Sequence, residues 1–119
     1  HCVLADEAQF MTCAQIDQLE RVAKLDNISV IAHGLRSNVQ RNLFEGSKRL
    51  FELSDTIEKM PTMCQCGAQA EYNGRFLNDT FHVGEPIVMI DTIYPGARYQ
   101  SMCAGCYLTH FDDPASITA

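Results

Sequence analysis

The pattern of apolar and polar residues predicts a strand–helix–strand unit at the start of the chain. Residues 2–5 form a short apolar run, which is typical of a buried strand in a parallel sheet. Between residues 16 and 23 apolar side chains recur at helical spacing, and Thr12 and Gln15 have the spacing of a capping box. A second apolar run at residues 28–32 predicts the next strand. Two such strands joined by a helix form a βαβ unit with a right-handed crossover.

The next segment is predicted to pass from a loop to a helix and then to a strand. Residues 34–42 are polar and leave the carboxyl end of the second strand. Residues 43–53 carry apolar side chains at the spacing of a shorter helix. Residues 56–60 alternate between apolar and polar side chains, which favours a strand.

The composition changes in the middle of the chain, and this change predicts two domains. The fold class is therefore α/β, with a parallel-sheet core in residues 1–60 and a small β domain in residues 61–119. Within the second domain, short strands are expected near residues 69–76 and 87–90. The tail after Tyr107 is expected to be frayed.

Composition and charge exclude some classes of function. Nine basic residues face fifteen acidic ones, and the formal net charge of −6 argues against non-specific binding of nucleic acid. No apolar run approaches the length of a membrane span, so no membrane association is expected. A hydrophobic content of 46% and a mean hydropathy of −0.11 are ordinary for a globular protein.

Four of the six cysteines form two tight pairs, which are Cys64 with Cys66 and Cys103 with Cys106. Two pairs separated by a long insert are typical of four thiolates around one tetrahedral ion, so we favour a closed structural zinc site and a reducing, cytoplasmic setting. Free thiol pairs, a redox pair and a disulfide formed on oxidation are the alternatives. The other two cysteines, Cys2 and Cys13, are expected to be packed thiols.

Two adjacent carboxylates, Asp6 and Glu7, end the first predicted strand. This is the place where α/β proteins bind ligands, and an aspartate there can hold Mg²⁺ while a neighbouring glutamate accepts a proton. Neighbours on a regular strand point to opposite faces, so the backbone is expected to turn directly after Asp6. A solvated strand end with Asp6 capping a turn is the alternative. The tetrapeptide DEAQ is also similar to that of DEAD-box helicases, but the chain lacks the length and the basic surface that RNA binding requires.

Together these segments resemble the type II thymidine kinases of the bacterial and phage branch. The resemblance is carried by DEAQF, HGLRSNVQRNLFEGSKRLFEL, IEKMPTMCQCG and RYQSMCAGCY, in the family's order and near its spacing. It implies a P-loop kinase core followed by a zinc-bearing lasso domain. It further implies ATP-dependent phosphoryl transfer to the 5′-hydroxyl of thymidine, salvage of deoxynucleotides in the cytoplasm, and a homotetramer.

The resemblance also implies roles for individual residues. Glu7 matches the general base, and Asp6 matches the carboxylate that holds the Mg²⁺ of ATP through water. The nucleoside contacts match Phe10, Leu35, Val39, Phe44, Ile87, Val88, Met89, Ile90, Asp91 and Tyr99. The zinc ligands match Cys64, Cys66, Cys103 and Cys106, although that branch often has histidine at the last position.

The chain departs from the family pattern in several places, and two of them bear most on function. The family's glycine-rich phosphate loop lies upstream of the strand that matches residues 2–5, so we expect residues 1–119 to be a carboxyl-terminal part that is inactive alone. The family's Gly-Gly turn is Asp91-Thr92 here, which predicts a changed lasso geometry. A non-catalytic, zinc-stabilised binding or regulatory module derived from a nucleoside kinase is the main alternative function. A zinc-ribbon interaction protein without a nucleotide ligand is the other.

Overall fold

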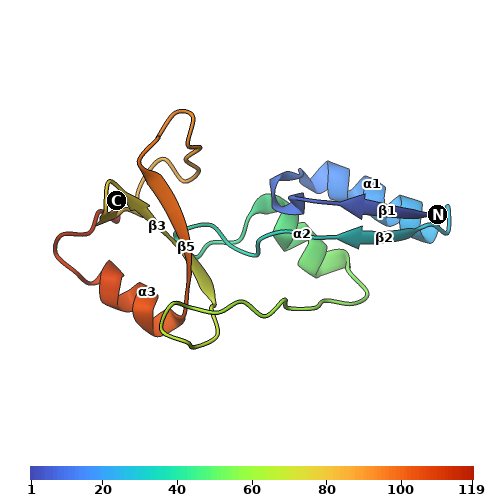
Figure 1. Cartoon of the computed structure of the whole chain (residues 1–119). Coiled ribbons are helices and arrows are strands. Elements are labelled where there is room, and N and C mark those ends of the chain that lie inside the picture. The colour runs from blue at the N-terminus through green and yellow to red at the C-terminus, as the bar shows by residue number, and fades with distance from the viewer. The chain divides into compact units, whose positions relative to one another are not determined.

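The computed structural model describes residues 1–119, which form two compact units (Figure 1). Unit 1 contains His1–Arg36 and Leu43–Glu58, and unit 2 contains Ser37–Asn42 and Lys59–Ala119. The short segment Ser37–Asn42 thus leaves unit 1 and packs within unit 2. The fold is mixed α/β, with a small parallel sheet in unit 1 and an antiparallel sheet in unit 2. The division into a kinase core and a lasso domain remains a prediction.

Unit 1 contains the predicted strand–helix–strand unit and a second helix. Its elements are β1 (Cys2–Ala5), the 3-10 helix η1 (Ala8–Phe10), α1 (Cys13–Lys24), β2 (Ser29–Ala32) and α2 (Glu45–Leu53). The two strands pair in parallel, so that Leu4 lies opposite Ile31. Helix α1 packs against β2 and α2, and α2 also packs against η1. The carboxyl ends of both strands therefore point to one edge of the sheet, as the pattern predicted.

The strands of unit 1 are less buried than predicted. Leu4 is 75% exposed and Ile31 is 59% exposed, whereas Val3 and Val30, on the other face, are partly buried. Strand residues alternate between the two faces of a sheet, and the helices of unit 1 cover only one of those faces. The prediction of strands is confirmed, and the prediction that both faces are buried is wrong. The expectation of packed thiols at the two isolated cysteines is also wrong, since both are exposed.

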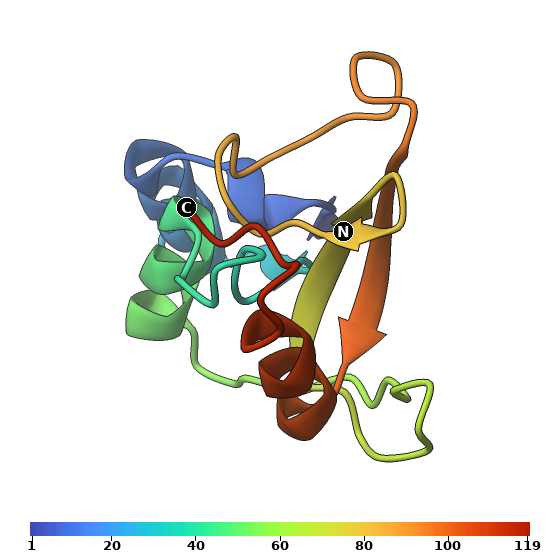
Figure 2. The same ribbon diagram turned by 90° about the vertical axis from the view of Figure 1, so that its left-hand side faces the viewer.

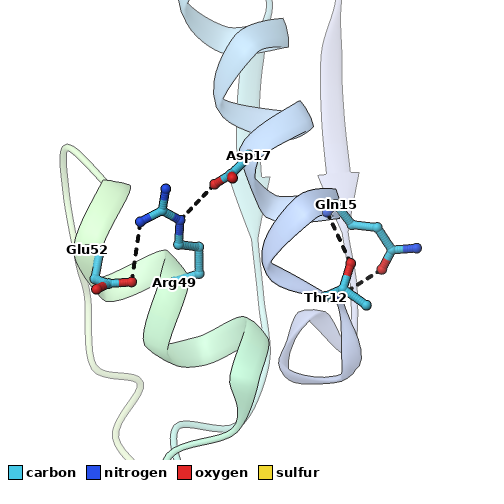
Figure 3. Close-up of polar contacts among 5 residues, drawn as sticks. All are labelled: Thr12, Gln15, Asp17, Arg49 and Glu52. Carbon is cyan, nitrogen blue, oxygen red and sulfur yellow. Dashed lines mark hydrogen bonds and ion pairs between the residues drawn. The ribbon is translucent and has the colours of Figure 1, made fainter.

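The two helices of unit 1 are joined by side-chain contacts, which Figure 3 shows. The Arg49 guanidinium of α2 donates to Asp17 of α1 over 2.7 Å and lies 3.5 Å from Glu52. The hydrogen bond to Asp17 raises the pKa of Arg49.

Glycine at position 46 lets α2 approach η1, because a Cβ there would collide with the carbonyl oxygen of Ala8.

Unit 2 is a three-stranded antiparallel sheet with a helix packed on it. Its elements are β3 (Tyr72–Leu77), β4 (Thr80–Phe81), β5 (Ala97–Met102) and α3 (Ala104–Phe111), with strand order β4-β3-β5. Figure 2 shows α3 beside the paired strands β3 and β5. The core of unit 2 gathers around α3 and the sheet, and its buried members are Val39, Cys64, Phe76, Phe81, Val83, Met102 and Tyr107.

Three predictions made from the sequence are wrong, two of them for strands and one for the tail of the chain. Residues 56–60 and 87–90 form no strand, because alternation yields a strand only where a partner strand supplies hydrogen bonds. The tail is not frayed: α3 continues to Phe111, and the Ile117 N–H donates to the carbonyl of Phe81 over 2.9 Å. Strand β5 was not predicted, since its sequence ARYQSM has no regular apolar alternation.

No helix combines the length and the apolar character that crossing a membrane requires.

The capping box at the start of α1 gives a stability prediction. The Gln15 N–H donates to the Thr12 hydroxyl over 3.2 Å, and the Thr12 N–H donates to the Gln15 side chain over 2.9 Å (Figure 3). Thr12→Ala removes the hydroxyl acceptor and should lower the free energy of unfolding by about 1 kcal/mol in urea titrations. Thr12→Ser keeps the acceptor and serves as the control, with a loss below half of that value.

Candidate functional site

The backbone turns directly after Asp6, as predicted. Glu7 adopts the left-handed conformation, with φ 52° and ψ 39°, which is uncommon for a residue other than glycine. The Glu7 N–H donates to Asp6 Oδ1 over 2.9 Å, and His33 Nδ1 lies 3.4 Å from the same oxygen. Both carboxylates are exposed at the carboxyl edge of the parallel sheet. Strain at such an edge is typical of a functional position.

The side chain of Gln9 fixes the turn that carries Asp6 and Glu7, a role that was not predicted from the sequence. Its side-chain amide is 2% exposed; Nε2 donates to Glu7 Oε2 over 2.5 Å, and Oε1 accepts from the Leu35 N–H over 3.1 Å. One amide thereby links the carboxylate at the end of β1 to the segment that follows β2. Gly34 leaves room for this amide, because a Cβ there would collide with Gln9 Oε1. The only sequence signal was a polar residue between two hydrophobic ones.

Three predicted nucleoside contacts lie near the acidic turn within unit 1. The rings of Phe10 and Phe44 meet edge to face, with centroids 5.5 Å apart at an interplanar angle of 75°. Phe10 is largely exposed, and Leu35 is also exposed, in the chain segment that Gln9 holds. The Leu35 carbonyl accepts a hydrogen bond from the Ser47 hydroxyl of α2. Their role in binding remains a prediction, but the structure brings the two rings together.

The predicted lasso residues lie in unit 2 and form an ordered loop without strand structure. The Tyr99 hydroxyl accepts from the Met89 N–H over 3.0 Å and donates to the Met89 carbonyl over 2.9 Å. Met89 is buried, whereas Val88, Ile90 and Asp91 are exposed and Ile87 is partly buried. In this conformation Tyr99 therefore fixes the backbone of Met89, one of the predicted nucleoside contacts.

A buried arginine, which the sequence analysis did not single out, holds the start of the lasso loop. Arg75 of β3 is fully buried, and its guanidinium donates to the carbonyls of His82, Gly84 and Ile87 over 2.7 to 2.9 Å. The planar fork of arginine can reach three acceptors at once, which lysine cannot. The only sign of this role in the sequence is one charged residue within a strand that is partly apolar.

The remaining predicted contact, Val39, lies in the core of unit 2. Its side chain is 3% exposed, and its carbonyl accepts a hydrogen bond from the Tyr107 hydroxyl over 2.5 Å. Burial raises the pKa of Tyr107, so the phenol keeps its proton and remains a donor. A contribution of Val39 to a nucleoside pocket remains a prediction.

The two cysteine pairs meet in unit 2, as the spacing predicted. The four sulfur atoms all lie within 4.8 Å of one another, and Cys66 Sγ lies 3.6 Å from Cys103 Sγ. Tetrahedral zinc with Zn–S bonds of 2.3 Å requires sulfur atoms ~3.8 Å apart, so the donor set fits a closed structural site. The first pair lies in a tight turn, where Gly67 has a φ of 93°, and the second pair lies in the first turn of α3.

Hydrogen bonds within the cluster separate the thiol pKa values. Backbone hydrogen bonds from Cys103 and Cys66 lower the pKa of the Cys64 thiol to about 6. Hydrogen bonds with the thiols of Cys103, Cys66 and Cys64 raise the pKa of Cys106 to about 12. At neutral pH the cluster thus holds both a negative charge and a proton that a bound cation would displace.

Comparison with known proteins gives a consistent match. A sequence profile described as thymidine kinase matches residues 1–107. The chain is 44% identical over 107 residues to a thymidine kinase of Chromobacterium violaceum, which covers 89% of this chain and 56% of that protein. It is 40% identical over 96 residues to a thymidine kinase of Enterobacteria phage T4, covering 79% of this chain and 50% of that protein. The chain therefore spans about half the length of these relatives.

Zinc binding should weaken steeply as the pH falls. Cys106 must release its proton to bind, so the apparent affinity should fall by at least about tenfold for each pH unit between 8 and 6. Below about pH 6 the Cys64 thiol is also protonated, so the slope should increase by about a further tenfold for each unit. Competition titrations with a chromophoric chelator measure both slopes. Cys66→Ser should abolish tight binding, and unchanged affinity in that variant would contradict the four-thiolate site.

Arg75 gives a second prediction, on stability. Arg75→Met leaves three carbonyl oxygens without their donor and should lower the free energy of unfolding by about 3 kcal/mol. Arg75→Lys should recover only part of this loss. Arg98→Met, on the neighbouring strand β5, replaces an exposed arginine that stacks on Phe76 and should change stability by less than about 1 kcal/mol. Urea titrations of the three variants measure these changes in the free energy of unfolding.

Proposed function

The chain belongs to the thymidine kinase family, and from that premise we propose that it takes part in ATP-dependent phosphoryl transfer to the 5′-hydroxyl of thymidine. In this proposal residues 1–119 supply the proton acceptor, nucleoside contacts and a structural zinc site. Unit 1 corresponds to part of a P-loop kinase core, and unit 2 corresponds to the zinc-bearing lasso. The reaction serves deoxynucleotide salvage in a reducing cytoplasm, where thiols stay available to zinc, and the complete enzyme is a homotetramer.

The geometry of Glu7 is the observation that carries the proposal. The left-handed turn exposes its carboxylate at the sheet edge, and Gln9 holds one oxygen, Oε2, by a hydrogen bond of 2.5 Å. The other oxygen, Oε1, is then directed by the same side chain and can accept the proton of an attacking hydroxyl. A carboxylate held in this way loses little conformational freedom when the substrate binds.

Asp6 is proposed to hold the magnesium ion that accompanies ATP. Its carboxylate is exposed, and oxygen ligands that leave room for water fit Mg²⁺. When bound, the ion neutralises charge on the transferred phosphoryl group. Asp6 also accepts the Glu7 N–H, so it has a second role in shaping the turn that presents the base.

The aromatic pair is proposed to bind the thymine ring. Phe10 presents an exposed ring that Phe44 supports from the side, and an exposed aromatic face of this kind can stack on a nucleobase. Leu35 adds an apolar contact next to it. In unit 2, the lasso residues 87–91 and Tyr99 are proposed to contribute further nucleoside contacts, with exposed side chains at Val88, Ile90, Asp91 and Tyr99.

The proposal predicts a defined defect for Glu7→Gln. The amide keeps the shape of the side chain but cannot accept the proton, so kcat for thymidine phosphorylation should fall at least about a hundredfold. The KM for thymidine should change little, because the residue acts on the reacting hydroxyl and not on the base. Steady-state assays of the full-length gene product with ATP and Mg²⁺ measure both parameters.

A matched exchange elsewhere provides the control. Glu58→Gln changes an exposed carboxylate outside the helices and strands of unit 1 and should leave both parameters within about twofold. Full activity of Glu7→Gln would remove Glu7 from the mechanism. A wild-type protein that binds zinc but phosphorylates no nucleoside would instead favour a non-catalytic module derived from a nucleoside kinase.

A further inference from the structure

The loop between β2 and α2 has its base and its tip in different units. At its base in unit 1, the Phe44 N–H donates to the Arg36 carbonyl over 3.4 Å. Its tip, Ser37–Asn42, packs within unit 2. Two of the predicted nucleoside contacts, Leu35 and Phe44, therefore flank a tip that the zinc-bearing unit holds.

The tip forms a tight turn of its own. Asn38 Oδ1 accepts from the N–H groups of Gln40 and Asn42 over 2.9 and 3.1 Å, and the Asn38 N–H donates to the Asn42 carbonyl over 2.8 Å. Arg41 has a φ of 67°, which is uncommon for a residue with a side chain. These bonds shape the turn, but they do not attach it to the rest of unit 2.

Two contacts attach the tip to α3. The Tyr107 hydroxyl donates to the Val39 carbonyl over 2.5 Å, and both residues are almost fully buried. The Arg41 guanidinium lies over three aromatic rings, at 4.8 Å from the centroid of Tyr107, 5.4 Å from Phe111 and 5.7 Å from Tyr72. Arg41 stays exposed, so its stacking is the weaker of the two contacts.

We propose that Tyr107 and Arg41 are positioning residues for nucleoside binding, which fix the β2–α2 loop tip to the zinc-side helix α3. Fixing the tip restricts the positions that Leu35 and Phe44 can reach, because both are joined to it by a few residues of chain. Tyr107 directly follows Cys106, so the helical turn that carries two of the thiols also carries the anchor. This inference rests on the proposed function, since the benefit of a fixed loop is binding of the nucleoside.

Tyr107→Phe tests the hydrogen bond with the ring kept. The exchange of amide hydrogens in residues 38–42 should accelerate at least about fivefold, and the KM for thymidine should rise roughly three- to tenfold, as expected for one lost hydrogen bond. The kcat should stay within twofold, because the proposed general base, Glu7, is not altered. The zinc content should stay unchanged, because the four thiols are not altered. Arg41→Gln removes the stacked cation and should give a smaller change of the same kind.

Two matched variants separate positioning from general stability. Thr109→Val removes a hydroxyl from the exposed face of the same helix, where it donates to the Gly105 carbonyl, and Arg98→Gln removes a cation stacked 4.6 Å from the Phe76 centroid. Both should leave the exchange of residues 38–42 and the KM unchanged. Equal effects in these controls, or unchanged exchange and KM in Tyr107→Phe, would overturn the inference.

The two readouts also separate this inference from the proposed function. Amide exchange is measured without any nucleoside, so accelerated exchange in Tyr107→Phe supports the anchoring of the tip whatever the substrate. If the wild-type protein neither binds nor phosphorylates thymidine, the proposed function fails, and the role of the anchor in nucleoside binding fails with it.

Discussion

The antiparallel pairing of β3 with β5 is the constraint on which the four-cysteine cluster of unit 2 depends. Its register sets Tyr72 opposite Met102, and the Glu71 N–H donates to the Met102 carbonyl over 2.8 Å. The segment that precedes β3 carries the first thiol pair, and the helix that follows β5 carries the second. A change of register by one residue would turn the side chains of a strand to the other face and separate the sulfur atoms. Backbone pairing thus brings the two thiol pairs of the donor set together.

Buried polar side chains organise the segments that lack regular structure. Gln9 links Glu7 to Leu35 in unit 1, and Arg75 links three carbonyls at the start of the lasso in unit 2. In each case one side chain with several donors or acceptors satisfies polar groups of an irregular segment. Burying such a side chain is costly unless every polar atom is paired, so these contacts specify one loop conformation.

Helix α3 connects the proposed metal site with the loop that leaves the parallel sheet. One end of its first turn carries Cys103 and Cys106, and the next residue, Tyr107, reaches the Val39 carbonyl. A zinc ion at the thiols would therefore do more than hold two chain segments together. It would also fix the orientation of the helix that anchors the loop tip, so the proposed metal site and the β2–α2 loop depend on the same short helix.

The sequence by itself determined the local features. The apolar runs predicted β1 and β2, the spacing of Thr12 and Gln15 predicted the capping box, and the two cysteine pairs predicted the thiol cluster. Each of these depends on residues close together in the chain or on a residue type with few roles.

Only the tertiary structure decided which segments pair and which side chains are buried. Residues 56–60 alternate like a strand but have no partner strand, whereas β5, whose alternation is interrupted at Ser101, pairs along its whole length with β3. Arg41 lies in a polar loop and stays exposed, yet its guanidinium stacks on three rings from distant parts of the chain. Strand pairing and side-chain burial depend on contacts between residues far apart in the sequence. A local pattern of apolar and polar residues does not determine the free energy of such contacts.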